Sequence, residues 1–222
     1  NNKIANKQEF INTKYPVRDK KDFKNIVNIS KTICNNTEFE LSAHQMFIRN
    51  FMSFQTPYNS LLLFHGLGTG KTCSSITVCE EMRTYFNQLN IKKKIMIVAQ
   101  PNVQENYKIQ LFDKSKLKNI DGLWNLKSCT GNKFLKEINP MNMKGLSKDK
   151  VIHQIEKIIK SSYEFMGHQQ FANKIGKIIG KNKLNLSDEE QKKKKIKAIQ
   201  AEFSNRLLVI DEVHNVRNVE GL

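Results

Sequence analysis

SLLLFHGLGTGKT, residues 60–72, is the most informative segment of the chain. Its first part is a short continuous apolar run, which predicts a strand buried on both faces over residues 60–64. A glycine-rich loop follows and ends in Lys71 and Thr72, and apolar residues at helical spacing come after it. A strand, a glycine loop and a helix in this order are typical of a phosphate-binding loop.

The loop residues have the chemistry that a nucleoside triphosphate requires. Glycines let the backbone turn tightly and direct N–H groups at phosphate oxygens, and the start of a helix adds its positive dipole end. Lys71 would reach the β- and γ-phosphates, and the hydroxyl of Thr72 would bind Mg²⁺. The strict pattern begins with glycine where this chain has His65, and we interpret this as a variant of a working loop. The predicted nucleotide-binding residues are Gly66, Leu67, Gly68, Thr69, Gly70, Lys71 and Thr72.

A second motif, LLVIDEVH, occupies residues 207–214. Four apolar residues followed by two acids predict carboxylates at the C-terminal end of a central strand, where ligands bind in open α/β sheets. Asp211 would hold Mg²⁺, and Glu212 would polarise the attacking water. Alone, the pattern also fits a strand that meets an exposed acidic turn, but the upstream loop favours the catalytic interpretation.

The rest of the pattern predicts an α/β fold with a parallel central sheet. A second buried strand is expected over residues 94–99 and a last one over residues 207–210. Helices are expected over residues 41–54, 104–112, 151–159 and 187–203, the last opened by a capping box at Ser187 and Glu190. Residues 1–40 are polar and predict an N-terminal arm, and residues 41–222 predict the ATP-binding domain.

Composition limits the partners and the compartment. The chain has 37 Lys and Arg against 21 Asp and Glu, a net charge of +16 that favours a polyanionic partner, although Lys-rich and Asn-rich chains also reflect AT-rich genomes. No apolar run approaches the roughly 20 residues of a bilayer span, so no membrane partner is expected. The four cysteines form no CxxC pair, which argues against a zinc module or a disulfide scaffold and favours an intracellular reducing compartment.

The lysines are concentrated in residues 131–200, which hold sixteen Lys and seven acidic residues. The run Lys192–Lys195 fits either a solvated helix face or a set of phosphate contacts. Four aromatic side chains are expected to pack in the core rather than to stack on bases. They are Trp124, Tyr163, Phe165 and Phe171.

GTGKT at 68–72 and DEVH at 211–214 together resemble motifs I and II of superfamily 2 helicases of the DExH type. Longer strings are more similar to one branch, the helicases of nucleo-cytoplasmic large DNA viruses. HGLGTGKT, IVAQPNVQENYKIQLFD at 97–113 and DEVHNVRN at 211–218 resemble the poxvirus early transcription factor small subunit and termination-factor helicases. The resemblance covers residues 41–218, and the Lys and Asn bias favours a giant virus.

This resemblance implies a RecA-like P-loop NTPase domain, the first motor domain of a two-domain helicase, with a Lys-rich insertion within residues 114–200. It implies ATP and Mg²⁺ as ligands, and nucleic acid (DNA or RNA) and viral RNA polymerase or other virion transcription proteins as partners. The implied location is the virion and the viral factory in the host cytoplasm. Because the chain stops eleven residues after Asp211, we expect the second domain and its arginine to be missing, and residues 1–222 alone to be nearly inactive.

The resemblance also assigns roles to single residues. Gln45, in LSAHQ at 41–45, is similar to the glutamine that reads adenine, although an ordinary surface glutamine remains an alternative. His214 would couple the state of the γ-phosphate to the partner domain. Gln100, Pro101 and Asn102 match the motif that touches the nucleic-acid backbone, and a plain strand-end turn explains them equally well.

Two other functions remain open. A P-loop kinase or a packaging motor would share the first motif, but the histidine of DEVH and the string at 97–113 count against both. A nucleotide-binding structural subunit of a virion transcription complex would use the same fold as a docking platform.

Overall fold

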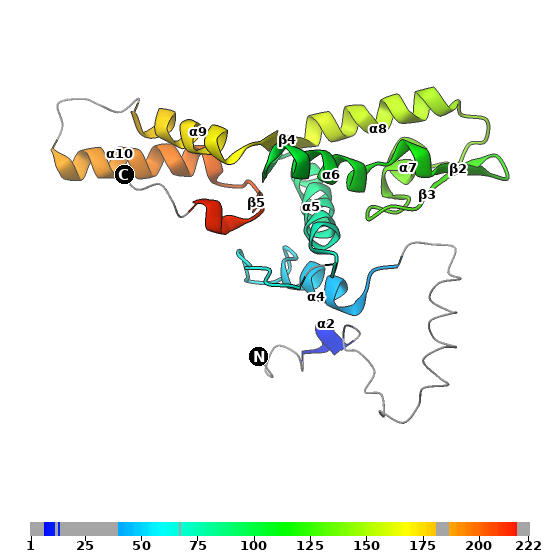
Figure 1. Cartoon of the computed structure of the whole chain (residues 1–222), viewed down its shortest axis with the longest axis horizontal. Helices are drawn as coiled ribbons and strands as arrows, with labels where there is room; N and C mark the ends of the chain where they lie inside the picture. The colour runs from blue at the N-terminus through cyan, green and yellow to red at the C-terminus, as the bar shows by residue number, and fades with distance from the viewer. Residues whose placement is uncertain (1–6, 12, 14–39, 67, 181–186, 217–222) are drawn as a thin grey trace. The chain divides into compact units, whose positions relative to one another are not determined.

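The computed structural model of the chain describes residues 7–11, 13, 40–66, 68–180 and 187–216 (Figure 1). The chain divides into two compact units, residues 1–81 with 110–151, and residues 82–109 with 152–222. Most of the predicted N-terminal arm lies outside the described residues. No helix in the described ranges is both long and apolar enough to cross a membrane.

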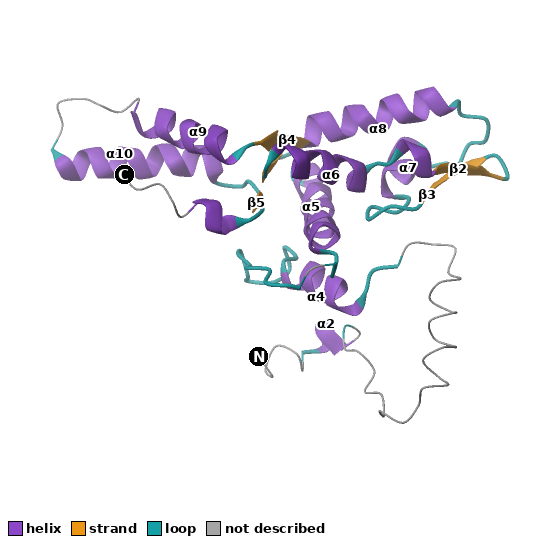
Figure 2. Ribbon diagram, in the orientation of Figure 1, coloured by secondary structure: helices purple, strands orange, loops and turns teal. Residues whose placement is uncertain are grey.

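The second unit contains a parallel three-stranded sheet in the order β4-β1-β5, drawn in orange in Figure 2. Its strands are β1 (Ile95–Val98), β4 (Tyr163–Met166) and β5 (Leu208–Ile210), and Ile97 of β1 lies opposite Phe165 and Val209. All four residues of β1 are buried, as expected for a strand with neighbours on both sides. The α/β class, the parallel sheet and the strands near residues 94–99 and 207–210 are therefore confirmed.

Helices α9 (His168–Gly180) and α10 (Asp188–Phe203) lie side by side in this unit (Figure 1). The capping box that opens α10 is confirmed, since the Ser187 N–H donates to Glu190 Oε2 at 3.2 Å. Tyr163 and Phe171 are buried, as predicted for core aromatics. The core cluster comprises Met96, Val98, Met166 and Phe171, with Ile175, Phe203, Leu208 and Ile210 packed against it.

A network of salt bridges connects β4, α9, α10 and the segment just before β5. Arg206 bonds Glu202 at 2.8 Å and also contacts Glu164, and Lys174 reaches the same two carboxylates at 2.8 and 3.4 Å. The hydrogen bond from Lys174 lowers the pKa of Glu202, and the charges of Arg206 and Lys93 add to it against the opposing effect of burial. The ionised carboxylate therefore stabilises the fold above its ordinary pKa, and that contribution is lost as the pH falls through the lowered value.

The first unit contains α2 (Gln8–Ile11), α4 (Ala43–Phe51), η1 (Lys114–Lys116), a β-hairpin and α7 (Lys133–Ile138). The hairpin pairs β2 (Leu117–Ile120) with β3 (Leu123–Leu126) through Asp121 and Gly122, whose φ angles of 52° and 86° fit a tight two-residue turn. Trp124 packs as predicted, because it is half-buried and its Nε1 donates to the Leu146 carbonyl at 2.8 Å.

Three predicted helices correspond to α5 (Lys71–Gln88), α6 (Pro101–Leu111) and α8 (Lys148–Ser162). Pro101 opens α6 three residues before the predicted start, because proline fits the first helical position, where no N–H is needed. The short η2 (Val213–Val216) follows β5. Strand β4 comes from within residues 114–200, so the range assigned to an insertion also contributes to the central sheet.

The prediction of a buried strand over residues 60–64 is wrong for this structure. This segment is irregular, and Leu62 and Phe64 are 74% and 94% exposed. A strand needs a hydrogen-bonded neighbour, and among the described strands none pairs with this segment. The apolar run alone therefore could not specify a strand.

We expect Arg206→Ala to lower the free energy of unfolding by roughly 1–2 kcal/mol, because it removes one of the two cations that Glu164 and Glu202 share and leaves Lys174 as the other. The loss is smaller than for a fully buried pair because Glu164 and Glu202 are 33% and 32% exposed. Urea denaturation at pH 7 measures it, and the loss should shrink at acid pH as the glutamates become protonated.

Lys116→Ala is the matched control, because it removes the Lys116–Asp113 pair, whose lysine is 55% exposed. This control should leave the free energy of unfolding close to the wild-type value, because solvent screens an exposed ion pair. Equal effects of the two substitutions at pH 7 would contradict the assigned role of the network.

Candidate nucleotide-binding site

The predicted phosphate loop leads directly into α5, which begins at Lys71. Gly68 and Gly70 have φ angles of 76° and 80°, which favour glycine because other side chains meet steric hindrance there. Thr69 Oγ1 donates to the Gly66 carbonyl at 2.9 Å and closes the loop. Lys71 Nζ donates to the His65 carbonyl at 3.3 Å, so its ammonium group lies against the loop itself. Leu67 lies outside the described residues.

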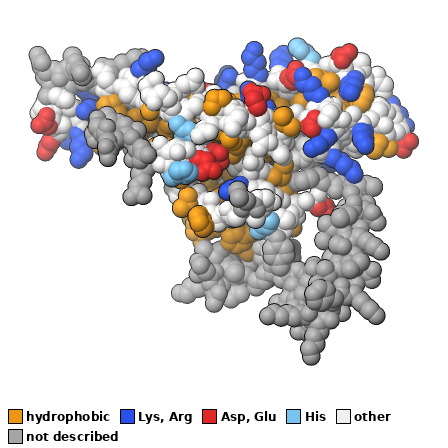
Figure 3. Space-filling model, in the orientation of Figure 1, with side chains coloured by type: hydrophobic (Ala, Val, Ile, Leu, Met, Phe, Trp, Pro, Cys, Tyr) orange, Lys and Arg blue, Asp and Glu red, His pale blue; other side chains and the backbone are white. Residues whose placement is uncertain are grey.

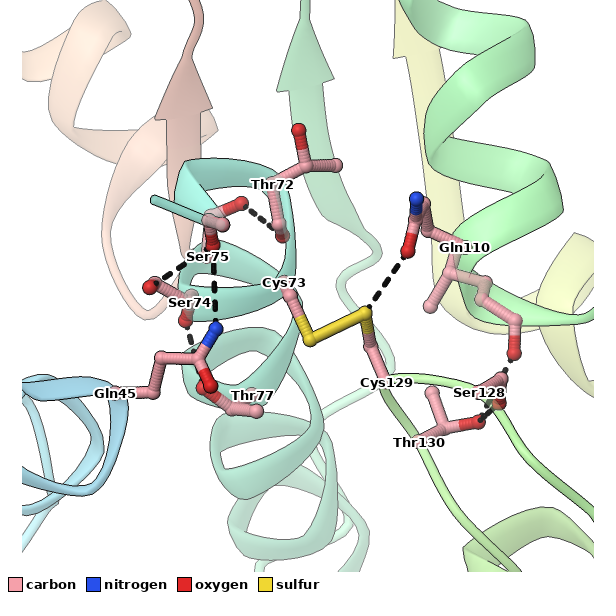
Figure 4. Close-up of a disulfide and its surroundings, with 12 residues drawn as sticks. Gln45, Thr72, Cys73, Ser74, Ser75, Thr77, Gln110, Ser128, Cys129 and Thr130 are labelled. Carbon is pink, nitrogen blue, oxygen red and sulfur yellow. Dashed lines mark hydrogen bonds between the residues drawn. A yellow bond between two sulfur atoms is a disulfide. The ribbon is translucent and has the colours of Figure 1, made fainter. Parts of the chain in front are cut away.

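Helix α4 contacts this loop through the side chain of Gln45. Its Oε1 accepts the Ser42 N–H at 3.0 Å in a capping box, and its Nε2 lies 3.5 Å from the Gly70 carbonyl. The side chain points toward the first turn of α5 and the residue is 8% exposed, so Gln45 is not a surface residue, and its contact with adenine stays a prediction (Figure 4). A Cβ at Gly70 would lie 2.7 Å from Gln45 Nε2, so a side chain there would displace the end of Gln45, and the φ of 80° disfavours it independently.

Two histidines also contact the loop, and the sequence analysis gave neither of them a role. His44 Nε2 lies 3.0 Å from the Thr69 carbonyl oxygen. The His44 ring packs edge-on against the His65 ring, with 5.6 Å between the ring centroids. His65 Nδ1 is buried and has no hydrogen-bond partner in the described part of the chain. Two features of the sequence could have indicated these contacts. His44 is next to Gln45, and His65 stands where the strict phosphate-loop pattern has glycine.

These residues suit a bound phosphate. The backbone around two left-handed glycines and the lysine at the start of an 18-residue helix provide donors for anionic oxygens. His65 Nδ1 has no partner among the described residues and would donate only in the tautomer that places a hydrogen on it. Within the described ranges no three His, Cys, Asp or Glu side chains form a metal-binding group. Mg²⁺ remains compatible with the site, because this ion commonly uses one or two protein carboxylates together with substrate phosphates and water.

The acidic half of the predicted site lies in the second unit, whereas the phosphate loop and Gln45 lie in the first. Asp211 follows β5 directly, and its N–H donates to the Val98 carbonyl at 2.9 Å. Glu212 has a φ of 49°, unusual for a residue with a side chain, and its Oε2 lies 3.2 Å from His214 Nδ1. The two side chains are 52% and 70% exposed, so they are accessible to a ligand.

Gln100, Pro101 and Asn102 lie where β1 passes into α6, and all three are exposed. The Gln100 carbonyl accepts the Gln104 N–H at 2.9 Å, which starts the helix. This turn follows the carboxyl end of β1, the strand end that also pairs with Asp211. The turn is therefore on the ligand-binding edge of the sheet, and contact with nucleic acid stays a prediction.

A disulfide between Cys73 and Cys129 joins the first turn of α5 to the segment before α7 (Figure 4). Their Cα atoms are 5.4 Å apart and they are separated by 56 residues, a pairing that no local spacing indicates. The expectation of no disulfide framework is corrected by this pair, because the fold brings together two cysteines that are 56 positions apart in the sequence. Cys79 is the free cysteine of this helix, and burial raises the pKa of its thiol.

Comparison with known proteins finds relatives among large DNA viruses. The chain is 27% identical over 196 residues to a protein of Acanthamoeba polyphaga mimivirus named as a candidate ATP-dependent RNA helicase, covering 86% of this chain and 27% of the relative. It is 27% identical over 186 residues to a candidate helicase of Invertebrate iridescent virus 3, covering 80% of this chain and 15% of the relative. An African swine fever virus homologue of the early transcription factor large subunit is 22% identical over 219 residues, 82% of this chain and 20% of the relative.

These relatives confirm the resemblance to helicases of nucleo-cytoplasmic large DNA viruses. The transcription-factor relative is named for the large subunit, whereas the motif comparison pointed to the small subunit. The chain spans less than a third of the length of each of these three proteins. No protein-family model and no solved structure matches the chain.

Reduction of the Cys73–Cys129 bond should destabilise the first unit. A cross-link between residues 56 positions apart restricts the unfolded chain, and its removal should cost up to about 4 kcal/mol of unfolding free energy. Urea denaturation with and without dithiothreitol measures the change. Cys129→Ser should match the reduced wild type and should not respond to dithiothreitol, whereas an unresponsive wild type would contradict the bond.

Proposed function

We propose that this chain is the ATP-binding half of a nucleic-acid-dependent helicase or translocase that serves viral transcription. The observation that carries this proposal is the glycine loop before α5, with Lys71 as the first residue of the helix. The side chain of Gln45, from α4, contacts the Gly70 carbonyl of this loop. The helicase relatives, which match more than three quarters of the chain, support it. Residues 41–222 would form the RecA-like first motor domain with a Lys-rich insertion, and residues beyond this chain would supply the second.

Binding of ATP would use the loop residues in the roles that their chemistry suits. Lys71 would exchange the His65 carbonyl for β- and γ-phosphate oxygens, which form stronger, charge-assisted bonds. Gln45 would face the adenine, and the loop backbone would hold the phosphates. Thr72 and Asp211 would hold Mg²⁺, which neutralises phosphate charge when it is bound.

Hydrolysis would depend on the acidic turn after β5. Glu212 would accept a proton from the attacking water, and it is exposed enough to reach that water. His214 lies against the same carboxylate, so a change at Glu212 on hydrolysis would reach His214 directly. This contact gives a physical route by which the state of the nucleotide could be passed to a partner domain.

Nucleic acid is the partner that the charge favours. Lys and Arg side chains gather over α8 in the space-filling view, and Lys148, Lys150, Lys157 and Lys160 of this helix are exposed (Figure 3). Three of the four lysines in the run 192–195 of α10 are also exposed. Lysines free to meet phosphates release counterions from DNA or RNA and so provide binding without sequence preference.

A nucleotide-binding subunit without motor activity is the second candidate. The similarity to a protein named as an early transcription factor homologue supports it. In this role the chain would serve as a docking platform for viral RNA polymerase and other virion transcription proteins in the host cytoplasm. Both candidates require ATP binding, and only the helicase requires turnover that nucleic acid stimulates.

Lys71→Ala should largely abolish binding of ATP with Mg²⁺. The loss of a charge-assisted phosphate contact should weaken affinity by several-fold to a hundredfold, on the order of 1–3 kcal/mol. A fluorescent ATP analogue measures this on residues 1–222. Lys118→Ala, at an exposed lysine of β2, is the control and should leave affinity unchanged, while equal affinity of wild type and Lys71→Ala would remove the basis of the proposal.

Glu212→Gln should separate binding from chemistry in the complete protein that contains this chain. The amide keeps the size of the side chain but cannot accept a proton, so ATP affinity should persist while turnover falls. Steady-state ATPase assays with nucleic acid present measure the effect. Turnover at the wild-type rate would show that another group is the base.

Residues 1–222 should bind DNA or RNA in a salt-sensitive, sequence-independent way, with an affinity of roughly micromolar or weaker near physiological salt. Fluorescence anisotropy with labelled single strands, titrated at several salt concentrations, gives the slope of log affinity against log salt. A slope near zero would show that the lysines do not meet phosphates.

A further inference from the structure

His168, the first residue of α9, contacts the acidic motif although 43 residues separate it from Asp211. Its Nε2 lies 2.9 Å from the Asp211 carbonyl oxygen. A carbonyl oxygen can only accept, so Nε2 carries the hydrogen and donates it. The bond therefore fixes the orientation of the peptide group that joins Asp211 to Glu212.

Asp211 is consequently held through both of its backbone groups. Its N–H donates to the Val98 carbonyl at 2.9 Å and continues the pairing of β5 with β1, while its carbonyl accepts from His168. The next residue, Glu212, has a φ of 49°. The left-handed region is unfavourable for a residue with a side chain and persists only where surrounding contacts enforce it.

The donor itself is firmly placed. His168 follows Gly167, whose N–H is capped by Gln170 Oε1 at 3.0 Å and whose carbonyl accepts the Phe171 N–H at 2.9 Å. Strands β4 and β5 are parallel and both flank β1, so the turn that carries His168 is at the same edge of the sheet as Asp211. The histidine is half-buried there.

We infer that His168 is a positioning residue for ATP hydrolysis. It holds the backbone between Asp211 and Glu212 and so fixes where their carboxylates meet Mg²⁺ and the attacking water, without touching the nucleotide itself. This inference rests on the proposed function for its catalytic consequence, whereas the backbone restraint can be measured without any activity.

The test compares His168→Gln with His168→Met. The two side chains have nearly the same length and shape, but only glutamine offers an N–H to the carbonyl. His153→Met, at an exposed histidine of α8, is the control for the loss of an imidazole. Amide hydrogen exchange on residues 1–222 reports the backbone directly.

We expect His168→Met to speed exchange at the amides of Asp211 and Asn215, which donate to the Val98 and Glu212 carbonyls. His168→Gln and His153→Met should match wild type. The inner amides of Met96 and Ala99 should stay protected in every variant. Unchanged exchange in His168→Met, or loss of protection at Met96 and Ala99 as well, would overturn the inference, because the side chain would then be dispensable or would serve packing alone.

The catalytic consequence is measured on the complete protein with nucleic acid. His168→Met should lower kcat by about 10- to 100-fold, as expected for a small misplacement of reacting groups, with KM for ATP within about threefold, and His168→Gln should recover most of the rate. Wild-type kcat in His168→Met would overturn the inference. No ATPase activity in wild type, together with the expected exchange pattern, would overturn the proposed function and leave the backbone restraint established.

Discussion

The parallel hydrogen bonding of β1 to β4 and β5 is the constraint on which the second unit depends. All four residues of β1 are buried, and its backbone groups are satisfied only because a strand lies on each side. The same pairing continues one residue beyond β5, where the Asp211 N–H reaches the Val98 carbonyl. The register of the sheet therefore decides where the acidic turn begins.

In the first unit, the comparable constraint is the close approach of α4 to the glycine loop. Gln45 uses the oxygen of its amide to cap α4 and directs the nitrogen at the Gly70 carbonyl, and a side chain at Gly70 would displace this nitrogen. If Gln45 reads adenine, as we propose, it also contacts the loop to which we assign the phosphates. Base recognition and phosphate binding could be coupled through this single side chain.

Sequence reasoning found the elements whose signals are local. The buried run of β1, the capping box at Ser187 and the glycine loop before α5 each depend on neighbouring residues. It did not find what depends on distant partners: the Cys73–Cys129 bond and the contact of His168 with Asp211. The prediction of a strand over residues 60–64 was wrong because a strand also needs a hydrogen-bonded neighbour, and an apolar sequence does not indicate whether one is present.

Our proposal assigns Mg²⁺ to Thr72 of the loop and to Asp211 of the acidic turn when ATP is bound. ATP affinity of residues 1–222 with Mg²⁺ and with EDTA, compared between wild type and Asp211→Asn, tests this claim most directly. Mg²⁺ should strengthen ATP binding by the wild type, and Asp211→Asn should remove most of that gain while leaving Mg²⁺-free binding intact. A full Mg²⁺ gain in Asp211→Asn would contradict the claim.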